Sequence, residues 1–344
     1  MSQVLDPDAV SHPHDLRVGV PDRLPAAVIR ELSRLRPGPV WRALLVEWGV
    51  IAATIALCTL LPWSAWLYPL AVIVIGSRQV ALTVLAHDAA HQRMFDHRVW
   101  NDVIGGMLAA WPTFITLGSF RHHHGEHHRH LEQPLDGNRF LWRTHKPDGT
   151  RRRDWVYPKT RAGLALKLLK VGLGLPGLRW MIGGQLTAIW FRTSWADLAL
   201  RVAWTAAIAA VLTALGGWAT FLWYWVVPFL TWHIVAQYVR LICEHSAIPA
   251  RADGAPEPYA LSRTTLARPL ERWLFVPRNI SYHVEHHFYP SVPFYNLPAL
   301  HEALMQTPGF RAHAVVTPSL AASLRQVLVV PGSPAARPVP VDAT

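Results

Sequence analysis

The chain has 344 residues, of which 51% are apolar and only 16% are charged. Because a typical soluble domain carries about 25% charged residues, this composition argues against a disordered chain and against an ordinary cytosolic enzyme. Basic residues outnumber acidic ones by 33 to 22, and 19 residues are histidine, nine of them between His87 and His130. Two cysteines in distant apolar stretches, Cys58 and Cys243, suggest neither a disulfide framework nor a thiolate metal site. Any metal would therefore be bound by histidine.

Two long stretches contain no formally charged residue, thirty residues over 48–77 and thirty-eight over 202–239. Because one helical span of a bilayer takes about 20 residues, each stretch predicts a hairpin of two helices. The first would turn at Pro62-Trp63-Ser64 and the second at Gly216-Gly217. The predicted spans cover about 43–62, 65–86, 198–215 and 219–241.

The basic residues predict how these spans are oriented. Neither predicted turn contains Lys or Arg, so the positive-inside rule places the N-terminus, the middle segment and the C-terminal third in the cytoplasm. We therefore interpret the net charge of +11 as a topological marker and expect no nucleic-acid partner. The predicted fold class is an all-α membrane protein with four transmembrane helices in two hairpins and a cytoplasmic helical cap. A composition rich in Ala, Arg and Pro suggests a GC-rich bacterium, so the expected location is the bacterial cytoplasmic (inner) membrane.

The remaining segments are assigned by composition. Val103 to Ser119 is apolar but only seventeen residues long and broken by glycine and proline, which predicts a re-entrant or interfacial segment. Between 143 and 170 lie nine Lys or Arg, and an overlapping leucine-rich stretch could lie in the membrane interface. This positive surface would attract either lipid headgroups or an acidic electron-donor protein. The predicted divisions are a cytosolic lead-in without a signal peptide (1–40), a membrane domain (41–305), a cytosolic C-terminal helix (306–330) and a disordered tail (331–344).

Three groups of histidines share a spacing that suits metal binding. One group has the form H-x-x-x-H and two have the form H-x-E-H-H, so within each group the spacing places the side chains on one face of a helix. All three are predicted on the cytoplasmic side, a coincidence that is not expected of solvated surface histidines. The groups are His87 and His91 in HDAAH, His124, His127 and His128 in HGEHH, and His283, His286 and His287 in HVEHH.

Eight imidazoles exceed the four protein ligands of one tetrahedral ion and suggest two metal ions in a shared site. Imidazole suits iron, copper, zinc and nickel, so the ligand type alone does not choose the metal. An all-imidazole shell is neutral and leaves the charge of the metal uncompensated. Asp88, Glu126 and Glu285 each adjoin a candidate ligand, and each is either a hydrogen-bond acceptor for a distal ring nitrogen or a plain surface carboxylate.

A ninth ligand is expected from the fourth span. His233, Gln237, Arg240 and Glu244 follow one face of this helix, and His245 falls at its cytoplasmic end. Ionisable groups within a span usually face the interior of a bundle. We expect His245 to bind metal and the deeper His233 to line the interior.

The sequence resembles the membrane-bound fatty acid desaturase family, within the three-histidine-box superfamily of desaturases and hydroxylases. HDAAH, HGEHH and HVEHH match its three boxes, and the stretch NISYHVEHHFYPSVPFYNLPALH is similar to the third box of bacterial desaturases. The resemblance covers about residues 40 to 305. It implies a site for two iron ions with O2 as co-substrate, ligated by the eight box histidines, with His245 as one more. Some relatives carry a fused cytochrome b5 domain marked by His-Pro-Gly-Gly, which is not found here. The expected electron source is therefore a separate ferredoxin or reductase, and the expected substrate is a membrane lipid or acyl chain.

Two alternatives remain open at this point. The same kind of centre serves hydroxylases and ketolases acting on lipids, carotenoids or specialised metabolites. A histidine-rich membrane protein can also be a metal transporter or a b-type cytochrome, but these place their ligands within the spans, where only His233 clearly lies.

Overall fold

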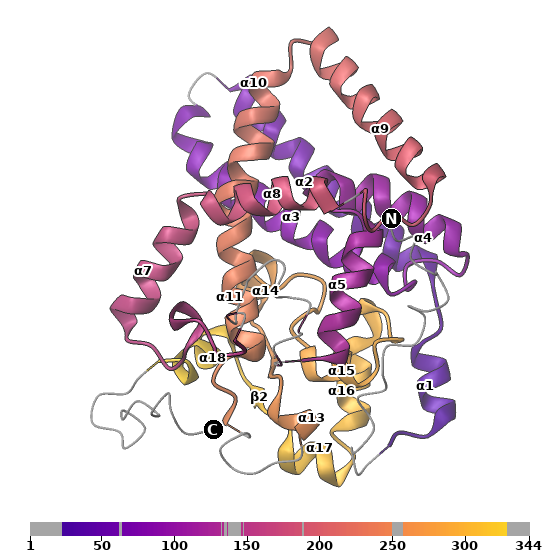
Figure 1. The fold of residues 1–344 in the computed structure, drawn as a ribbon, viewed down its shortest axis with the longest axis vertical. Coiled ribbons are helices and arrows are strands. Elements are labelled where there is room, and N and C mark those ends of the chain that lie inside the picture. Colours follow the sequence, from indigo (N-terminus) through magenta and orange to yellow (C-terminus); the bar gives the residue numbers. More distant parts are fainter. Residues whose placement is uncertain are drawn as a thin grey trace.

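The computed structural model describes residues 23–61, 64–131, 133, 136, 146, 148–187, 189–249 and 257–328. Over these ranges the chain is mostly helical (Figure 1). The described strands, β1 (Thr264–Thr265) and β2 (Val316–Thr317), form one short parallel pair. The predicted all-α architecture is confirmed.

Four helical segments are long and apolar enough to cross a membrane, which confirms the predicted number of spans. They cover Pro37–Leu60, Ala65–Ala90, Trp195–Ala214 and Trp218–His245. The second and fourth run a few residues beyond the predicted ends, so they carry His87 and His245 on continuous helix. Pro62 and Trp63 of the first predicted turn lie outside the described residues. The pairing into two hairpins and the side of the membrane stay predictions.

The helical elements of these segments differ in regularity and burial. Two π-helical turns interrupt the fourth segment, and such turns are frequent at functional sites. The most apolar window of the second segment is 72% buried, whereas that of the third is 0% buried. Figure 1 shows the third segment leaning away from the other three. The elements are α2 (Pro37–Leu60), η1 (Ser64–Leu67), α3 (Tyr68–Ala90), α9 (Trp195–Ala214), α10 (Trp218–Phe221), η5 (Leu222–Val226), η6 (Phe229–His233) and α11 (Ile234–His245).

The segment after the first histidine box folds back against α3. Two helical stretches, Arg98–Thr113 and Leu117–Arg129, meet at an angle of 82°, the geometry of a broken span or a re-entrant loop. At Gly105 a Cβ atom would lie 2.4 Å from Cβ of Ala89, so a glycine is needed for this close approach to α3. The elements are α4 (Arg98–Gly105), η2 (Gly106–Ala110), η3 (Trp111–Thr113) and α5 (Leu117–Arg129).

Two short helices follow the basic segment and expose leucines to the surroundings. They are α7 (Arg161–Gly172) and α8 (Leu175–Thr187), preceded by the single turn η4 (Arg153–Trp155). Leu169 and Leu186 are each 65% exposed. Exposed leucines beside Arg and Lys are typical of a helix that lies in the membrane interface, as the sequence predicts.

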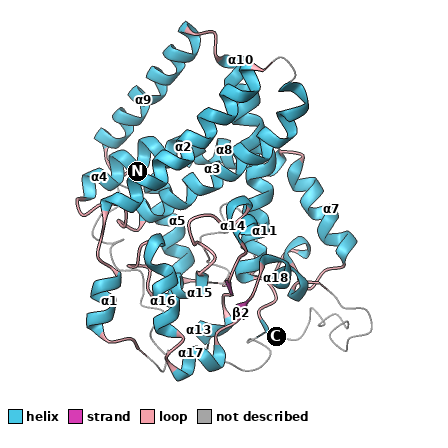
Figure 2. Ribbon diagram, turned by 180° about the vertical axis from the view of Figure 1, so that it is seen from behind, coloured by secondary structure: helices cyan, strands magenta, loops and turns pink. Residues whose placement is uncertain are grey.

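The C-terminal third forms a helical cap, seen from the front in Figure 1 and from behind in Figure 2. The N-terminal helix α1 packs against it through Ile29 and Leu32, and the N–H of Leu24, just before this helix, donates to the Tyr289 hydroxyl at 3.1 Å. In place of one helix over 306–330 there are two short helices and a strand, since Pro318 interrupts the helical pattern. Residues 1–22 and the predicted tail 331–344 lie outside the described residues. The elements are α1 (Ala26–Leu32), α13 (Glu257–Ala260), α14 (Pro269–Leu274), α15 (His283–Phe288), η7 (Phe294–Asn296), α16 (Leu297–Leu304), α17 (Pro308–His313) and α18 (Leu320–Gln326).

Candidate metal centre

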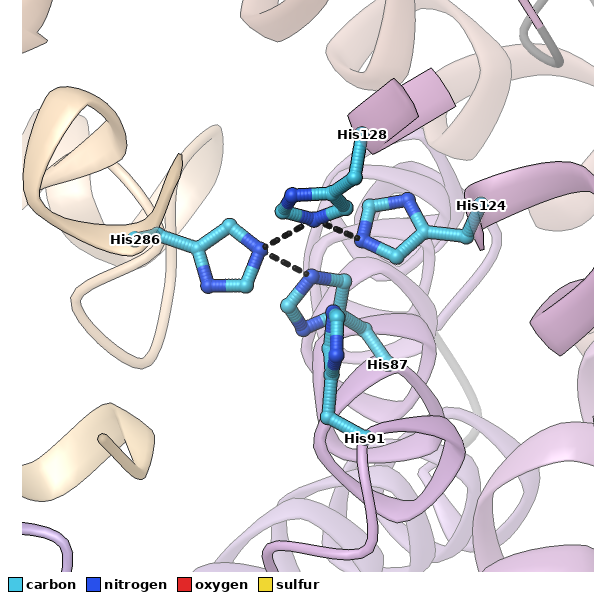
Figure 3. A group of neighbouring side chains, drawn as sticks. All are labelled: His87, His91, His124, His128 and His286. Carbon is cyan, nitrogen blue, oxygen red and sulfur yellow. Dashed lines mark hydrogen bonds between the residues drawn. The ribbon is translucent and has the colours of Figure 1, made fainter. Parts of the chain in front are cut away.

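Nine histidines from four separate segments converge where α3, α5, α11 and α15 meet. They form two groups, and within each group the ligand nitrogens all lie within 4.8 Å of one another. Every histidine predicted from the sequence as a ligand candidate is included. The five-histidine group, shown in Figure 3, is His87, His91, His124, His128 and His286. The four-histidine group is His127, His245, His283 and His287.

The nitrogen spacing in the five-histidine group fits a single metal ion. Nε2 of His286 lies 3.0 Å from Nε2 of His87 and 3.1 Å from Nε2 of His128. Nε2 of His128 lies 3.0 Å from Nε2 of His124. Two imidazole nitrogens about 2.1 Å from one ion and about 90° apart are separated by about 3 Å. The buried Nε2 of His91 has no hydrogen-bond partner among the described residues, as expected for an atom reserved for a metal.

The nitrogen spacing in the four-histidine group also fits a single metal ion. Nε2 of His283 lies 2.8 Å from Nε2 of His245 and 3.1 Å from Nε2 of His287. The ring of His127 completes the group, with its centroid 5.0 Å from that of His245. The two groups adjoin one another, since the rings of His128 and His287 are 4.6 Å apart. The arrangement is able to hold two ions side by side.

Each H-x-E-H-H box contributes to both groups, although its spacing suggested a single converging face. In an α-helix, residues four apart point within about 40° of each other, whereas adjacent residues diverge by about 100°. His124 and His128 therefore join one group, and His127 joins the other. In the third box, His283 and His287 join the four-histidine group, and His286 joins the five-histidine group. Each of these two boxes thus supplies histidines to both candidate ion positions from one continuous stretch of chain.

Arg121 connects the helix of the second histidine box, α5, to the end of α3, which carries the first box, by hydrogen bonds. This buried side chain on α5 donates from Nε to the Ala90 carbonyl at 3.1 Å and from Nη2 to the Ala89 carbonyl at 3.2 Å. It also pairs with Asp102. These carbonyls end α3 beside His91, where a cation is favoured by the helix dipole.

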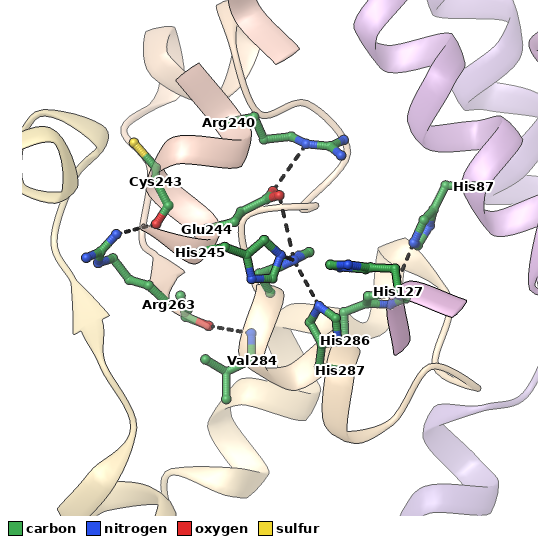
Figure 4. Close-up of polar contacts among 12 residues, drawn as sticks. His87, His127, Arg240, Cys243, Glu244, His245, Arg263, Val284, His286 and His287 are labelled. Carbon is green, nitrogen blue, oxygen red and sulfur yellow. Dashed lines mark hydrogen bonds and ion pairs between the residues drawn. The ribbon is translucent and has the colours of Figure 1, made fainter. Parts of the chain in front are cut away.

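Arg263 donates hydrogen bonds to the carbonyls at the end of α11, the helix that carries His245. Its Nη2 donates to the carbonyls of Ser246 at 3.1 Å and Ala247 at 2.9 Å, and Nη1 donates to the Cys243 carbonyl. Figure 4 shows this arginine against the end of α11. Nδ1 of His245 donates to the Leu261 carbonyl at 3.0 Å, which leaves Nε2 as the acceptor nitrogen.

The third box is held by Thr264 on β1. The Val284 N–H donates to the Thr264 hydroxyl at 3.2 Å, and this hydroxyl donates to Glu285 Oε2 at 2.5 Å. The first turn of α15 thereby receives a side-chain partner that its own sequence does not provide. Glu285 is fully buried and also accepts a hydrogen bond from Nδ1 of His301 at 2.5 Å.

The three acids expected beside the ligands have different surroundings. Asp88 is buried, and its Oδ1 lies 3.3 Å from Nδ1 of His87. Glu126 instead pairs with Arg129 and lies 3.4 Å from Nε2 of His130, three and four residues further along the chain. Glu285 contacts His301, a residue outside the nine.

Asp136 is an acid beside a ligand that no sequence pattern indicated. Nδ1 of His127 donates to Asp136 Oδ1 at 2.8 Å, which sets the tautomer with Nε2 as acceptor. Asp136 follows His127 by nine residues and lies beyond the end of α5, so no helical spacing could indicate the contact.

The histidines of the third box are suited to bind metal at neutral pH. Burial, followed by neighbouring histidines, holds the pKa of His283, His286 and His287 well below the ordinary value. These imidazoles are therefore neutral, the form that ligates metal. His233 is fully buried outside both groups, stacked on Phe229 at 4.5 Å, which agrees with an interior position rather than ligation.

A helical membrane architecture with two adjoining histidine groups at the ends of its spans defines a histidine-box membrane protein. The chain belongs to the fatty acid desaturase family, whose model matches residues 62–318. It is 30% identical to the dihydrorhizobitoxine desaturase of Bradyrhizobium elkanii, covering 82% of this chain and 80% of that protein. It is 23% identical to an sn-1 oleoyl-lipid 12-desaturase of Picosynechococcus sp. (87% and 84%) and 26% identical to that of Arthrospira platensis (85% and 82%). The family resemblance of the three boxes is confirmed.

Proposed function

We propose that this protein is an integral membrane di-iron acyl-lipid desaturase that uses O2 to introduce a carbon–carbon double bond into an acyl chain. The observation that carries the proposal is the pair of adjoining histidine groups at the ends of α3 and α11. A transporter would place its ligands along a pathway through the membrane, which this position disfavours. The membership in a desaturase family supports oxidoreductase chemistry.

The residues of the two groups suit iron. Nine imidazoles with nitrogen separations near 3 Å offer the number and type of ligand that two adjacent ions require. Two iron ions bound there would supply the activation of O2 and the removal of hydrogen from an unactivated carbon. The protein itself holds the ligands in place through Arg121, Arg263 and Thr264 and buries the groups away from water.

The names of the relatives suggest two substrate classes. The Picosynechococcus and Arthrospira relatives are named for an oleoyl lipid, and the Bradyrhizobium relative for dihydrorhizobitoxine. We favour an acyl lipid, because exposed leucines on α7 and α8 and four apolar spans place the protein against membrane lipid. Dihydrorhizobitoxine is the second candidate.

Product analysis tests this function. Membranes containing the protein are incubated with a labelled oleoyl lipid or dihydrorhizobitoxine, together with NADPH, ferredoxin and a ferredoxin reductase. The proposal expects a lipid product that is lighter than the substrate lipid by two hydrogens. The variants His127→Ala and His286→Ala should not form this product. A product heavier by one oxygen would instead identify a hydroxylase, and turnover of dihydrorhizobitoxine alone would identify the second candidate.

A separate electron carrier is part of the proposal. The exposed side chains of Arg152, Arg153 and Lys170 form a basic surface suited to an acidic protein such as a ferredoxin. If this surface receives the donor, Arg152→Glu combined with Arg153→Glu should raise the donor concentration needed for half-maximal rate without changing iron content.

We also place both termini on the cytoplasmic side of a bacterial inner membrane. The two native cysteines are buried, so a single new cysteine can report topology. Leu215→Cys, at a residue 79% exposed beside the Gly216-Gly217 turn, should react with an impermeant maleimide added to intact cells. Ala312→Cys, on the exposed face of α17, should react only after permeabilisation. The reverse pattern would contradict the orientation.

A further inference from the structure

Glu244 is a buried acid whose charge is poorly compensated by its surroundings. It precedes His245 on α11 and is 4% exposed. Its Oε1 lies 3.3 Å from Nε of Arg240 without a hydrogen-bond partner among the described residues, and its Oε2 lies 3.6 Å from Nε2 of His283. Figure 4 shows the carboxylate between the arginine and the histidine group. Burying a carboxylate costs free energy unless cations compensate for it, and one loosely placed arginine is a weak compensation.

The carboxylate approaches its histidine from the side where a metal would bind. Asp88 and Asp136 contact the distal Nδ1 atoms of His87 and His127, the usual position of an acid that orients a ligand. Glu244 contacts Nε2 of His283, the atom that also faces His245 and His287. Among the ion pairs of the described residues, Glu244 is the one acid that reaches this side of any of the nine histidines.

The distance agrees with shared coordination. Two donor atoms about 2.1 Å from one ion and about 120° apart are separated by about 3.6 Å. The four-histidine group also has one ligand fewer than its neighbour, and four imidazoles leave the charge of an ion uncompensated. A carboxylate oxygen would supply both a fifth ligand and a negative charge.

We propose that Glu244 is an oxygen ligand of the ion held by the four-histidine group, and that Arg240 orients its carboxylate. The inference rests on the proposed di-iron function. One iron would then have five nitrogen ligands, and the other four nitrogens and a harder carboxylate oxygen, so the two ions would be chemically different.

Iron binding by the full-length protein in detergent tests this assignment. Chelator-stripped protein is reloaded with Fe(II) without oxygen, and iron per chain and the rate of release to bipyridine are measured. Wild type should hold about two ions. Glu244→Ala should hold one of them as wild type does and bind the other more than about 100-fold more weakly, a larger loss than the about 10–100-fold typical of a residue that only hydrogen-bonds to a ligand. Glu302→Ala, at an exposed position on α16, should match wild type.

A second variant separates ligation from pairing with arginine. If Glu244 only pairs with Arg240, replacing both by leucine removes the pair without leaving a buried charge and should preserve both ions. The proposal expects this double variant still to lose one ion. Two ions with wild-type release rates in Glu244→Ala, or simultaneous loss of both, would overturn the assignment. Fewer than two ions in wild type would instead overturn the di-iron function itself.

Discussion

The carboxylate of Asp88 joins the first histidine box to the backbone at Phe294, just beyond the third box. Its Oδ2 accepts a hydrogen bond from the Phe294 N–H at 2.9 Å, while Oδ1 lies beside Nδ1 of His87. The two residues are far apart in sequence, and the contact is buried. One side chain therefore fixes both the orientation of a candidate ligand and the position of the cap relative to α3.

Removal of this acid should loosen the cap and weaken metal binding together. Asp88→Ala leaves a buried N–H unpaired, which typically costs about 1–3 kcal/mol. We expect a lower thermal midpoint in the iron-free protein and faster release of iron. Asp88→Asn keeps an oxygen acceptor and should lie between wild type and Asp88→Ala in both measurements. Equal stability in all three proteins would show that the contact does not hold the cap.

Arg121 should stabilise the packing of the second histidine box against the first. Arg121→Met removes two hydrogen bonds to the end of α3, with an expected loss of about 1.5–3 kcal/mol for each charge-assisted bond. The matched control is Arg129→Met, which removes a cation on the same helix that pairs only with Glu126 in the contacts of the described residues. Thermal unfolding of both variants checks the difference. Similar midpoints would contradict a structural role for Arg121.

Asp136, rather than Glu126, should support the four-histidine group. Asp136→Asn removes the charged acceptor of His127 Nδ1 and should weaken the binding of one iron by about 10–100-fold. Glu126→Gln should leave both ions bound, because this acid contacts Arg129 and His130 instead. Titration of the stripped proteins with Fe(II) compares the two. The opposite ranking would contradict the role assigned to Asp136.

The sequence predicted which histidines lie together, because histidine spacing depends on local helix geometry. His87 and His91, and the two H-x-E-H-H boxes, could be paired by counting residues along one helix. The four spans followed similarly from uncharged stretches of sufficient length. His245 could be predicted because an ionisable side chain on an apolar span usually faces the interior of the bundle, where the other boxes end.

What the sequence did not reveal depends on contacts between distant segments. The residues that cap α3 and α11, Arg121 and Arg263, lie in neighbouring elements and have no spacing relation to the carbonyls they bind. Asp136 lies beyond the end of α5, and the partners of Glu285, Thr264 and His301, lie on β1 and α16, so residue spacing along one helix could not indicate these contacts either. The division of each H-x-E-H-H box between two groups also depends on tertiary structure. The two sides of the helix that carries the box face histidines from different segments, and the sequence does not show which segments these are.

That division predicts which double variants act on the same ion. His127 and Glu244 belong to one candidate position, and His128 to the other. Glu244→Ala combined with His127→Ala should therefore leave one iron per chain. Combined with His128→Ala, the same change should disturb both ions, because changes at separate sites add. Iron content and the Mössbauer spectrum of each protein distinguish the cases, and identical spectra for the two double variants would refute the division.

The metal content of the purified wild-type protein tests the central claim most directly. The protein is produced in iron-sufficient medium, isolated at full length in detergent, and analysed for all transition metals and for haem absorption. We expect about two iron ions per chain and no haem. One ion per chain, stoichiometric zinc, or a bound haem would contradict the di-iron centre.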